Sequence, residues 1–433
     1  MKKIFSILAV AVAVAACVKS DPVNVPADTN RAVRFTASNM MQFQTKATAI
    51  ANGTQVGIYA GAPIGKDNVS YTVSMEENAT SGTLAATAAN SLLWAVGQTT
   101  QATKFLAVYP YAEVRDLLGE NEADKYISYE ISDAESVEYA NVFLAAAASQ
   151  APGAGETPAG VALAFKHPFA KLVYNIDNQS DDYVAGLKIS GIRRTGKLMF
   201  ATGDITTTGE PVAADEAVAL NANGANSYMT IAMPEAVAVN PVITVNMVSG
   251  AVYTFKLAEG IVLEAGKVYT ANIKLTGGHG AEISDRSVLG TFTVAAWENV
   301  NSGNMSADAS TPAAKWWYLE GNIDEIGGTT DGNWNKHIPF KCVSQYAWEV
   351  SFYYAGSADA TNGFKIRYAA SATDWEDAWG RDLVINADDI TAEGYLVDNT
   401  SHDSGNVRIS ATGKYKIVFY PDTHDFHIYK ITE

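Results

Sequence analysis

The residues best suited to a chemical task are aromatic rings and cations near the C-terminus. A sugar presents an apolar C–H face and a rim of hydroxyls, so flat rings beside a few fork-like donors suit it. The strand 363–368 alternates, and its two cations face outward if Phe364 and Ile366 face the core. The candidate glycan-binding residues are Trp334, Trp375, Trp379, Lys365 and Arg367.

Each of these residues also has a purely structural interpretation. Trp375 is equally explained as a plug beneath its loop, and Lys365 and Arg367 as a solvated face. Trp317 and Trp348 lie within strand patterns and are predicted to be core residues. An open site of this kind binds weakly, with a Kd of roughly millimolar to micromolar.

No catalytic or metal-binding motif stands out. The sequence lacks the G-x-S-x-G, H-E-x-x-H, P-loop and Rossmann signatures. Residues 331–335 begin like a calcium loop, but Lys336 replaces the turn glycine and Cys342 the bidentate glutamate. We therefore expect a protein that is not an enzyme and that binds no cofactor or metal. A pair of carboxylates for glycoside hydrolysis is defined by its separation in space, so the sequence neither shows nor excludes one.

The N-terminus carries an export signal. Lys2 and Lys3 precede the apolar run 4–16, which is too short to span a bilayer and ends at Cys17. The context around Cys17 resembles a lipobox, which implies that residues 1–17 are a lipoprotein signal ending in the lipidation cysteine. The alternative is an ordinary signal peptidase site near Ala-x-Ala with an incidental cysteine. Residues 18–32 have no periodicity and are predicted to be a flexible tether. We expect a lipid anchor in the outer membrane, with the protein facing the exterior.

The net charge limits the possible binding partners, and the cysteine count limits the possible disulfides. The net charge of −17 argues against nucleic acid, which needs a cationic footprint. The chain has 2 cysteines, so lipidation of Cys17 leaves Cys342 without an intramolecular partner. The strand-like setting of Cys342 predicts a buried, unreactive thiol.

The remaining chain has the period of two that β-strands produce. Segments such as 55–60 and 104–109 are rich in β-branched and aromatic residues, with Gly, Asn and Pro between them. The Pro- and Gly-rich stretch 149–160 predicts a first boundary, after which Val161–Phe165 is expected to open a second series of strands. The small, polar stretch 301–314 predicts a second linker. The predicted domains are 33–150, 160–303 and 313–433.

The first two domains resemble the fimbrillin family of Bacteroidota, the subunits and anchors of fimbriae. The ordered motifs that carry the resemblance are Thr45-Lys46-Ala47-Thr48, Gly57-Ile58-Tyr59, Phe105-Leu106-Ala107-Val108-Tyr109-Pro110-Tyr111, Leu163-Ala164-Phe165-Lys166-His167 and Gly266-Lys267-Val268-Tyr269. The resemblance implies two transthyretin-like β-sandwiches and, in polymerising members, cleavage after a basic residue that opens a groove for a donor strand. Lys46 lies at a suitable position for this cleavage. The alternative is that Lys46 is an ordinary loop lysine and the chain is not cleaved there.

The last domain resembles the SusE/SusF type of outer-membrane starch-binding module. Six of the 8 Trp residues lie in it, and the ordered matches include Trp317-Tyr318-Leu319-Glu320-Gly321, Trp348-Glu349-Val350-Ser351-Phe352 and Gly363-Phe364-Lys365-Ile366-Arg367-Tyr368. The resemblance implies an Ig-like, carbohydrate-binding β-sandwich. It departs in the long insert between Asp382 and Asp403.

These observations predict an all-β protein of three sandwiches. The expected function is that of a non-catalytic surface lipoprotein which binds a polysaccharide or other glycan through its last domain. The alternative is a fimbrial anchor, tip or pilus subunit that acts as an adhesin, with fimbrial subunits as partners.

Overall fold

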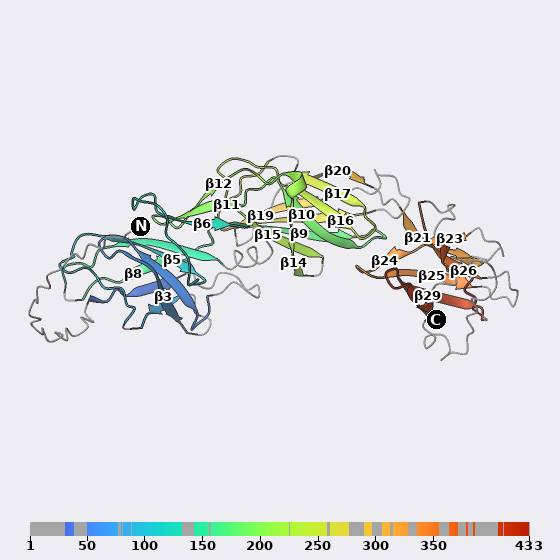
Figure 1. The fold of residues 1–433 in the computed structure, drawn as a ribbon, viewed down its shortest axis with the longest axis horizontal. Coiled ribbons are helices and arrows are strands. Elements are labelled where there is room, and N and C mark those ends of the chain that lie inside the picture. The colour runs from blue at the N-terminus through green and yellow to red at the C-terminus, as the bar shows by residue number, and fades with distance from the viewer. Residues whose placement is uncertain are drawn as a thin grey trace, which may run out of the picture.

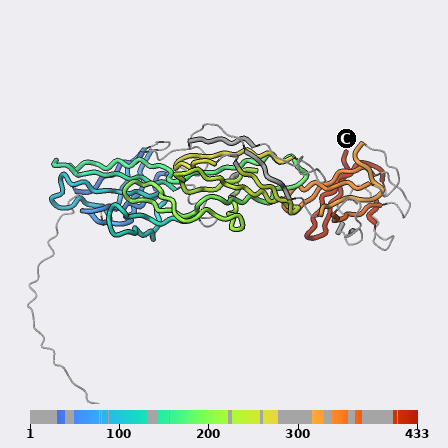
Figure 2. The backbone as a smooth tube through the Cα atoms, turned by 90° about the horizontal axis from the view of Figure 1, so that it is seen from above, coloured from blue at the N-terminus to red at the C-terminus, as the bar shows by residue number. Residues whose placement is uncertain are grey.

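The computed structural model describes most of the chain from residue 31 onward. The described ranges are 31–38, 50–76, 79, 81–87, 89–131, 143–155, 157–224, 226–257, 260–276, 290–296, 305–311, 315–327, 336–354, 363–370, 378–379, 384–385, 406–409 and 411–432. Three β-rich units follow one another in a row, with the C-terminal unit at one end (Figures 1 and 2).

The predicted all-β class is confirmed. The described residues form strand after strand, with a short 3-10 helix at Ala214–Glu216. Within these ranges we find no helix with the length and hydropathy needed to cross a bilayer.

The first unit is a seven-stranded sheet that curls around its own core. Its strands in spatial order are β7 (Leu144–Gln150), β5 (Thr103–Tyr109), β2 (Gln55–Ala60), β3 (Lys66–Ser74), β4 (Ser81–Ala85), β1 (Phe35–Ser38) and β8 (Val161–Ala164). An antiparallel bridge joins Ala145 of β7 to Lys166, just beyond β8, so the two edges of the sheet meet. Closure leaves few exposed strand edges and encloses the apolar side chains.

The prediction that Val161–Phe165 opens the second sandwich is wrong. β8 pairs in parallel with β1, from Phe35 opposite Val161 to Ser38 opposite Ala164. The first sheet therefore continues past the boundary predicted at 149–160. A strand's own alternation does not specify its sheet, because parallel partners are distant in sequence.

The first two units share a sheet and a core. β6 (Tyr126–Glu130) precedes the predicted boundary, yet it pairs with β11 (Thr195–Met199), which is flanked by β12 (Ile205–Thr208). A joint core, defined here as the buried side chains contributed by both units, lies beside it. Its members include Leu106, Val108, Phe143, Phe169, Phe200 and Ile231.

The second unit is a sandwich of two five-stranded sheets. One contains β13 (Val218–Ala219), β10 (Val184–Ser190), β16 (Val242–Met247), β17 (Val252–Leu257) and β20 (Met305–Thr311). The other contains β14 (Asn221–Gly224), β15 (Ser227–Ala232), β9 (Ala170–Asn178), β18 (Lys267–Leu275) and β19 (Gly290–Ala296). Alternating residues such as Leu172, Ile243 and Ile273 fill the space between them.

The stretch 301–314, predicted to be a linker, contains a strand. β20 pairs antiparallel with β17, from Val252 opposite Thr311 to Leu257 opposite Met305, with an irregularity in the register. β20 is the edge strand of its sheet, and its small and polar residues have the composition of a linker.

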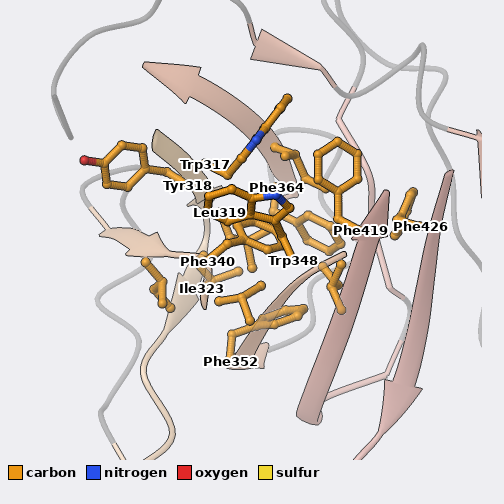
Figure 3. Packing of buried hydrophobic residues seen from close by; sticks show 14 of the residues in the cluster. Trp317, Tyr318, Leu319, Ile323, Phe340, Trp348, Phe352, Phe364, Phe419 and Phe426 are labelled. Carbon is orange, nitrogen blue, oxygen red and sulfur yellow. The ribbon is translucent and has the colours of Figure 1, made fainter. Parts of the chain in front are cut away.

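The third unit is the Trp-rich sandwich. Its first sheet contains β23 (Lys336–Pro339), β21 (Trp316–Gly321), β26 (Phe364–Ala369) and β27 (Ala378–Trp379). The second contains β22 (Ile323–Asp324), β25 (Trp348–Tyr354), β29 (Gly413–Tyr420), β30 (Asp425–Lys430) and β28 (Val384–Ile385), with β24 (Lys341–Cys342) paired to β25. Figure 3 shows Trp317 and Trp348 packed with Phe352, Phe364 and Phe419, so the prediction that these two tryptophans are core residues is confirmed.

Candidate functional site

A cluster of ionisable side chains lies on one face of the β23-β21-β26 sheet. The strand register sets Glu320 opposite both Lys365 and His337, and Tyr318 opposite Arg367. Directly opposed residues of antiparallel strands place their side chains on the same face. The pairing therefore brings together groups that are far apart in sequence, and we call Glu320, Lys365, Arg367 and His337 the ionic cluster.

The ionic cluster is built around Glu320. The Nε atom of Arg367 lies 2.5 Å from Oε2 of Glu320, and Nδ1 of His337 lies 2.9 Å from Oε1. The Arg367 guanidinium also lies 5.8 Å from the centre of the Tyr318 ring. The attraction between the Arg367 and Glu320 charges is strengthened where water is excluded, because the local dielectric is low.

The prediction that Lys365 and Arg367 face solvent is wrong. Phe364 and Ile366 do enter the core, as the alternation requires, but Lys365 is only 8% exposed and Arg367 is 0% exposed. Glu320, on the adjacent strand, supplies the opposite charge that makes their burial tolerable. Both cations thus lie in a covered sheet face, and neither is a solvated surface residue.

Burial changes the proton affinity of the ionic cluster. It raises the pKa of Glu320 from 4.5 to about 7, although Arg367 and Lys365 act to lower it. Burial lowers the pKa of His337, and the positive charge of Arg367 adds to that effect. Burial also lowers the pKa of Lys365, against the attraction of Glu320. Desolvation is the largest cause for all three groups because each charged form loses its hydration.

The raised pKa of Glu320 predicts a pH-dependent stability. A carboxyl whose pKa is higher in the folded state contributes stability that is fully present below pH 4.5 and is lost as pH rises through about 7. The shift corresponds to about 3 kcal/mol. Glu320→Gln should therefore remove most of the decline between pH 5 and pH 8.

The measurement is urea unfolding of the full chain, followed by tryptophan fluorescence, at both pH values. His337 contributes in the opposite direction, because a lowered pKa adds stability that is present above about pH 6.5. This contribution should remain in the variant. An equally steep decline in Glu320→Gln would assign the pH dependence to other groups.

Several predicted site residues lie outside the described residues. They are Cys17, Lys46, Trp334 and Trp375, together with the calcium-like stretch 331–335. Trp379 is described through its backbone, which pairs with Ile366 where β27 meets β26. Among the described residues, no three His, Cys, Asp or Glu side chains come together as metal ligands.

The first strand of the first unit is held on both sides. β1 pairs antiparallel with β4 and parallel with β8, and its Phe35 and Ala37 are both 2% exposed. The Phe35 ring makes edge contacts with Tyr71 and Phe105, at centroid distances of 5.1 and 5.3 Å. β1 therefore fills a slot that would expose two strand edges and a core position if the strand were removed.

Cys342 is buried, as predicted, at the junction of the second and third units. Its backbone N–H donates to the Asp181 carbonyl at 2.6 Å, and its side chain is 2% exposed. Burial, together with the negative charge of Asp182, raises the pKa of its thiol to about 12. The thiol is thus almost wholly protonated at neutral pH.

This environment predicts slow alkylation of Cys342. A free cysteine has a pKa of about 8.5, so the thiolate fraction at pH 8 should fall by roughly a thousandfold or more. In a Cys17→Ser chain, a thiol reagent should label the native protein that much more slowly than the protein in denaturant. Labelling at the rate of a free thiol would contradict the buried environment.

Sequence reasoning missed Glu320, His337 and Tyr318 as partners of the two cations. One signal was present, because Glu320 is a lone acid in the otherwise apolar segment 316–321. An acidic residue within a core strand usually has a buried cationic partner. Only the register of β21 with β26 and β23 identifies that partner.

The sequence profile of a family described as fimbrillin-like matches residues 44–297. This match covers more than half of the chain. The chain belongs to the fimbrillin-like family. The matched region contains most of the first unit and the second unit up to β19, which agrees with the predicted resemblance. The third unit lies beyond the match.

Solved structures similar to this fimbrillin-like chain include proteins from Bacteroides and Parabacteroides. A candidate cell adhesion protein from Bacteroides uniformis is 19% identical, with 63% of this chain and 99% of that chain covered and a TM-score of 0.46. A fimbrial assembly protein from Parabacteroides distasonis is 11% identical, with coverages of 64% and 98% and a TM-score of 0.38. No curated protein matches the sequence.

Proposed function

We propose that this chain is a cell-surface adhesion subunit of the fimbrillin-like family in which β1 is a replaceable strand. The observation that carries the proposal is the slot between β4 and β8, which β1 occupies with Phe35 in the core. Lys46 follows β1 in the sequence. Cleavage after Lys46 would separate β1 covalently from the rest of the sheet.

An extended segment from a neighbouring subunit then completes the sheet. Addition of a strand to an open edge uses main-chain hydrogen bonds for affinity and side-chain pockets for specificity. The incoming strand has to supply a large apolar residue opposite Leu84 and Val161, where Phe35 lies now. A strand without one leaves a cavity, so the slot selects among donor segments.

The experiment is limited digestion of the full chain with a lysine-specific protease. We expect cleavage after Lys46, loss of the N-terminal segment and growth of oligomers that resist dissociation by detergent. Lys46→Gln is the matched control and should remain uncut and monomeric. A chain that is cut at Lys46 but stays monomeric, even when a fimbrial subunit is added, would refute strand replacement.

The proposal includes a lipid anchor on Cys17, which holds the subunit in the outer membrane facing the exterior. The support is the short apolar run before Cys17 and the aperiodic sequence that follows it, predicted to be a tether over 18–32, although Ala32 at its end is bridged to Leu93. Cells grown with labelled palmitate should incorporate label into the chain, and Cys17→Ala should abolish it. Labelling that persists in Cys17→Ala would place the acyl chain elsewhere.

A second candidate function is glycan binding by the SusE/SusF-like third unit. It is favoured by the pairing of β27, which carries Trp379, with the strand that carries Arg367. Because Lys365 and Arg367 are buried, their role in this proposal is to fix β26, and direct contact with the sugar is assigned to Trp334, Trp375 and Trp379.

Affinity gels with embedded polysaccharides test this second function. The full chain should be retarded by at least one glycan, and Trp334→Ala and Trp379→Ala should each reduce the shift. Tyr346, which is 60% exposed in the same unit, provides the control variant Tyr346→Ala. Absence of retardation across a broad panel of glycans would rule the function out.

A further inference from the structure

A pocket of about 470 Å³ opens in the first unit, remote from the ionic cluster of the third unit. Its volume falls in the range of about 300–1,000 Å³ typical of small-molecule sites. Apolar and polar groups share the lining. The lining residues that carry the argument are Lys66, Ser70, Asn90, Ser91, Leu93 and Tyr111.

The pocket exists because neighbouring strands differ in length. β3 pairs with β2 from Lys66 to Thr72, but it pairs with β4 only from Thr72 to Ser74. Beyond Ala85 the chain leaves the sheet and returns as the segment 89–93. Beside the first half of β3, on the side of β4, the described residues therefore contain no paired strand. The segment 89–93 forms a wall there instead.

That wall is held in place before any ligand arrives. The Leu92 N–H donates to the buried Tyr71 hydroxyl at 2.8 Å, and Leu93 forms an antiparallel bridge with Ala32. Ser91 Oγ donates to the Thr87 carbonyl at 3.2 Å. A preformed wall lowers the ordering entropy that binding would otherwise cost.

The amide of Asn68, which also lines the pocket, is held in place by the neighbouring loop. Its Nδ2 group donates to the Ala112 carbonyl at 2.7 Å, next to Tyr111. Gly57 of β2 permits this arrangement, since a Cβ there would lie 2.5 Å from Asn68 Oδ1 and 3.4 Å from the Tyr111 ring. Together with the hydrogen bond from the Tyr111 N–H to the Gln55 carbonyl at 3.1 Å, the Asn68 contact fixes the backbone that carries the Tyr111 ring.

We propose that this pocket binds a saccharide of about one or two rings. Tyr111 supplies a ring for the apolar face of a sugar, and Leu93, 48% exposed, supplies further apolar surface. Ser70, Asn90 and Lys66 supply a hydroxyl, an amide and an ammonium for the sugar hydroxyls. Among the described residues of this lining Lys66 is the one charged side chain, and these residues do not form the cation cluster that a phosphate ligand requires. This site is independent of the glycan function proposed for the third unit.

Saturation-transfer NMR on the full chain tests the assignment with four probes: maltose, lactose, diacetylchitobiose and N-acetylneuraminic acid. At least one probe should show saturation of its ring protons. Tyr111→Ala should weaken its binding about tenfold, whereas Tyr111→Phe, which keeps the ring, should retain it. Ala89→Trp should block the pocket from its exposed rim without removing a core group.

Tyr346→Ala is the matched control and should bind as the parent chain does, because Tyr346 is an exposed tyrosine of the third unit. Absence of binding for all four sugars would overturn the inference. Binding that survives both Tyr111→Ala and Ala89→Trp would overturn it as well. Binding that only Trp334→Ala and Trp379→Ala abolish would place the sugar in the third unit and would also overturn it. Saturable binding of a peptide with the sequence 18–30, without any sugar signal, would show that the occupant is an extended chain.

Discussion

Arg367→Met is expected to lower the free energy of unfolding of the third unit by about 3–5 kcal/mol. Arg367 is 0% exposed, and its Nε lies 2.5 Å from the equally buried Glu320 carboxylate. Methionine fills a similar volume but leaves Glu320 without its closest cation. Removal of one partner of a buried ion pair is costly because the remaining charge is desolvated without compensation.

The loss should be larger at pH 8 than at pH 5. Without Arg367, the Glu320 carboxyl has a stronger tendency to be protonated in the folded protein, and protonation becomes more difficult as pH rises. Urea unfolding monitored by tryptophan fluorescence measures the effect, because six of the 8 tryptophans lie in this part of the chain.

An exposed ion pair of the same unit provides the control. Lys416 Nζ lies 3.1 Å from Glu349 Oε2, and their side chains are 36% and 34% exposed. Lys416→Met should cost less than about 1 kcal/mol, since solvent screens such pairs. If Arg367→Met costs no more than Lys416→Met, burial of the ionic cluster does not contribute to stability.

The strands of the third unit were predictable from sequence, but its buried charges were not. Alternation within 363–368 correctly assigns Phe364 and Ile366 to the core. It says nothing about which side chains accompany Lys365 and Arg367 on the opposite face, and these here include Glu320 from the adjacent strand, more than forty residues earlier. Exposure depends on register between distant strands, and register is a tertiary property.

The same limitation explains the misplaced boundaries in the first two units. Val161–Ala164 has an ordinary strand pattern, and only its parallel pairing with β1 assigns it to the first sheet. In Met305–Thr311 the alternating apolar residues are mostly alanines, so the strand period is weak and the composition is like that of a linker. Composition finds linkers by their polarity, and polar edge strands have the same composition.

Phe169→Ala is expected to destabilise the first and second units together, by about 3–5 kcal/mol. Phe169 is 0% exposed in the joint core. Its ring lies 4.8 Å from that of Tyr129 and 5.6 Å from that of Phe143, both contributed by the part of the chain before β8. The cavity left by alanine would therefore remove contacts from both units at once.

Hydrogen exchange of the full chain distinguishes shared from separate stability. Amides of β5 and β15, which contribute Leu106 and Ile231 to the joint core, should lose protection in parallel in Phe169→Ala. Phe255→Ala is the matched control, since Phe255 is 1% exposed in the core of the second unit alone. It should reduce protection in β16 and β17 and leave β5 unchanged.

If Phe169→Ala also leaves β5 unchanged, the two units unfold independently. In that case, loss of β1 from the first sheet would not be transmitted to the second unit, whereas a joint core makes the stability of both units depend on whether the β1 slot is filled.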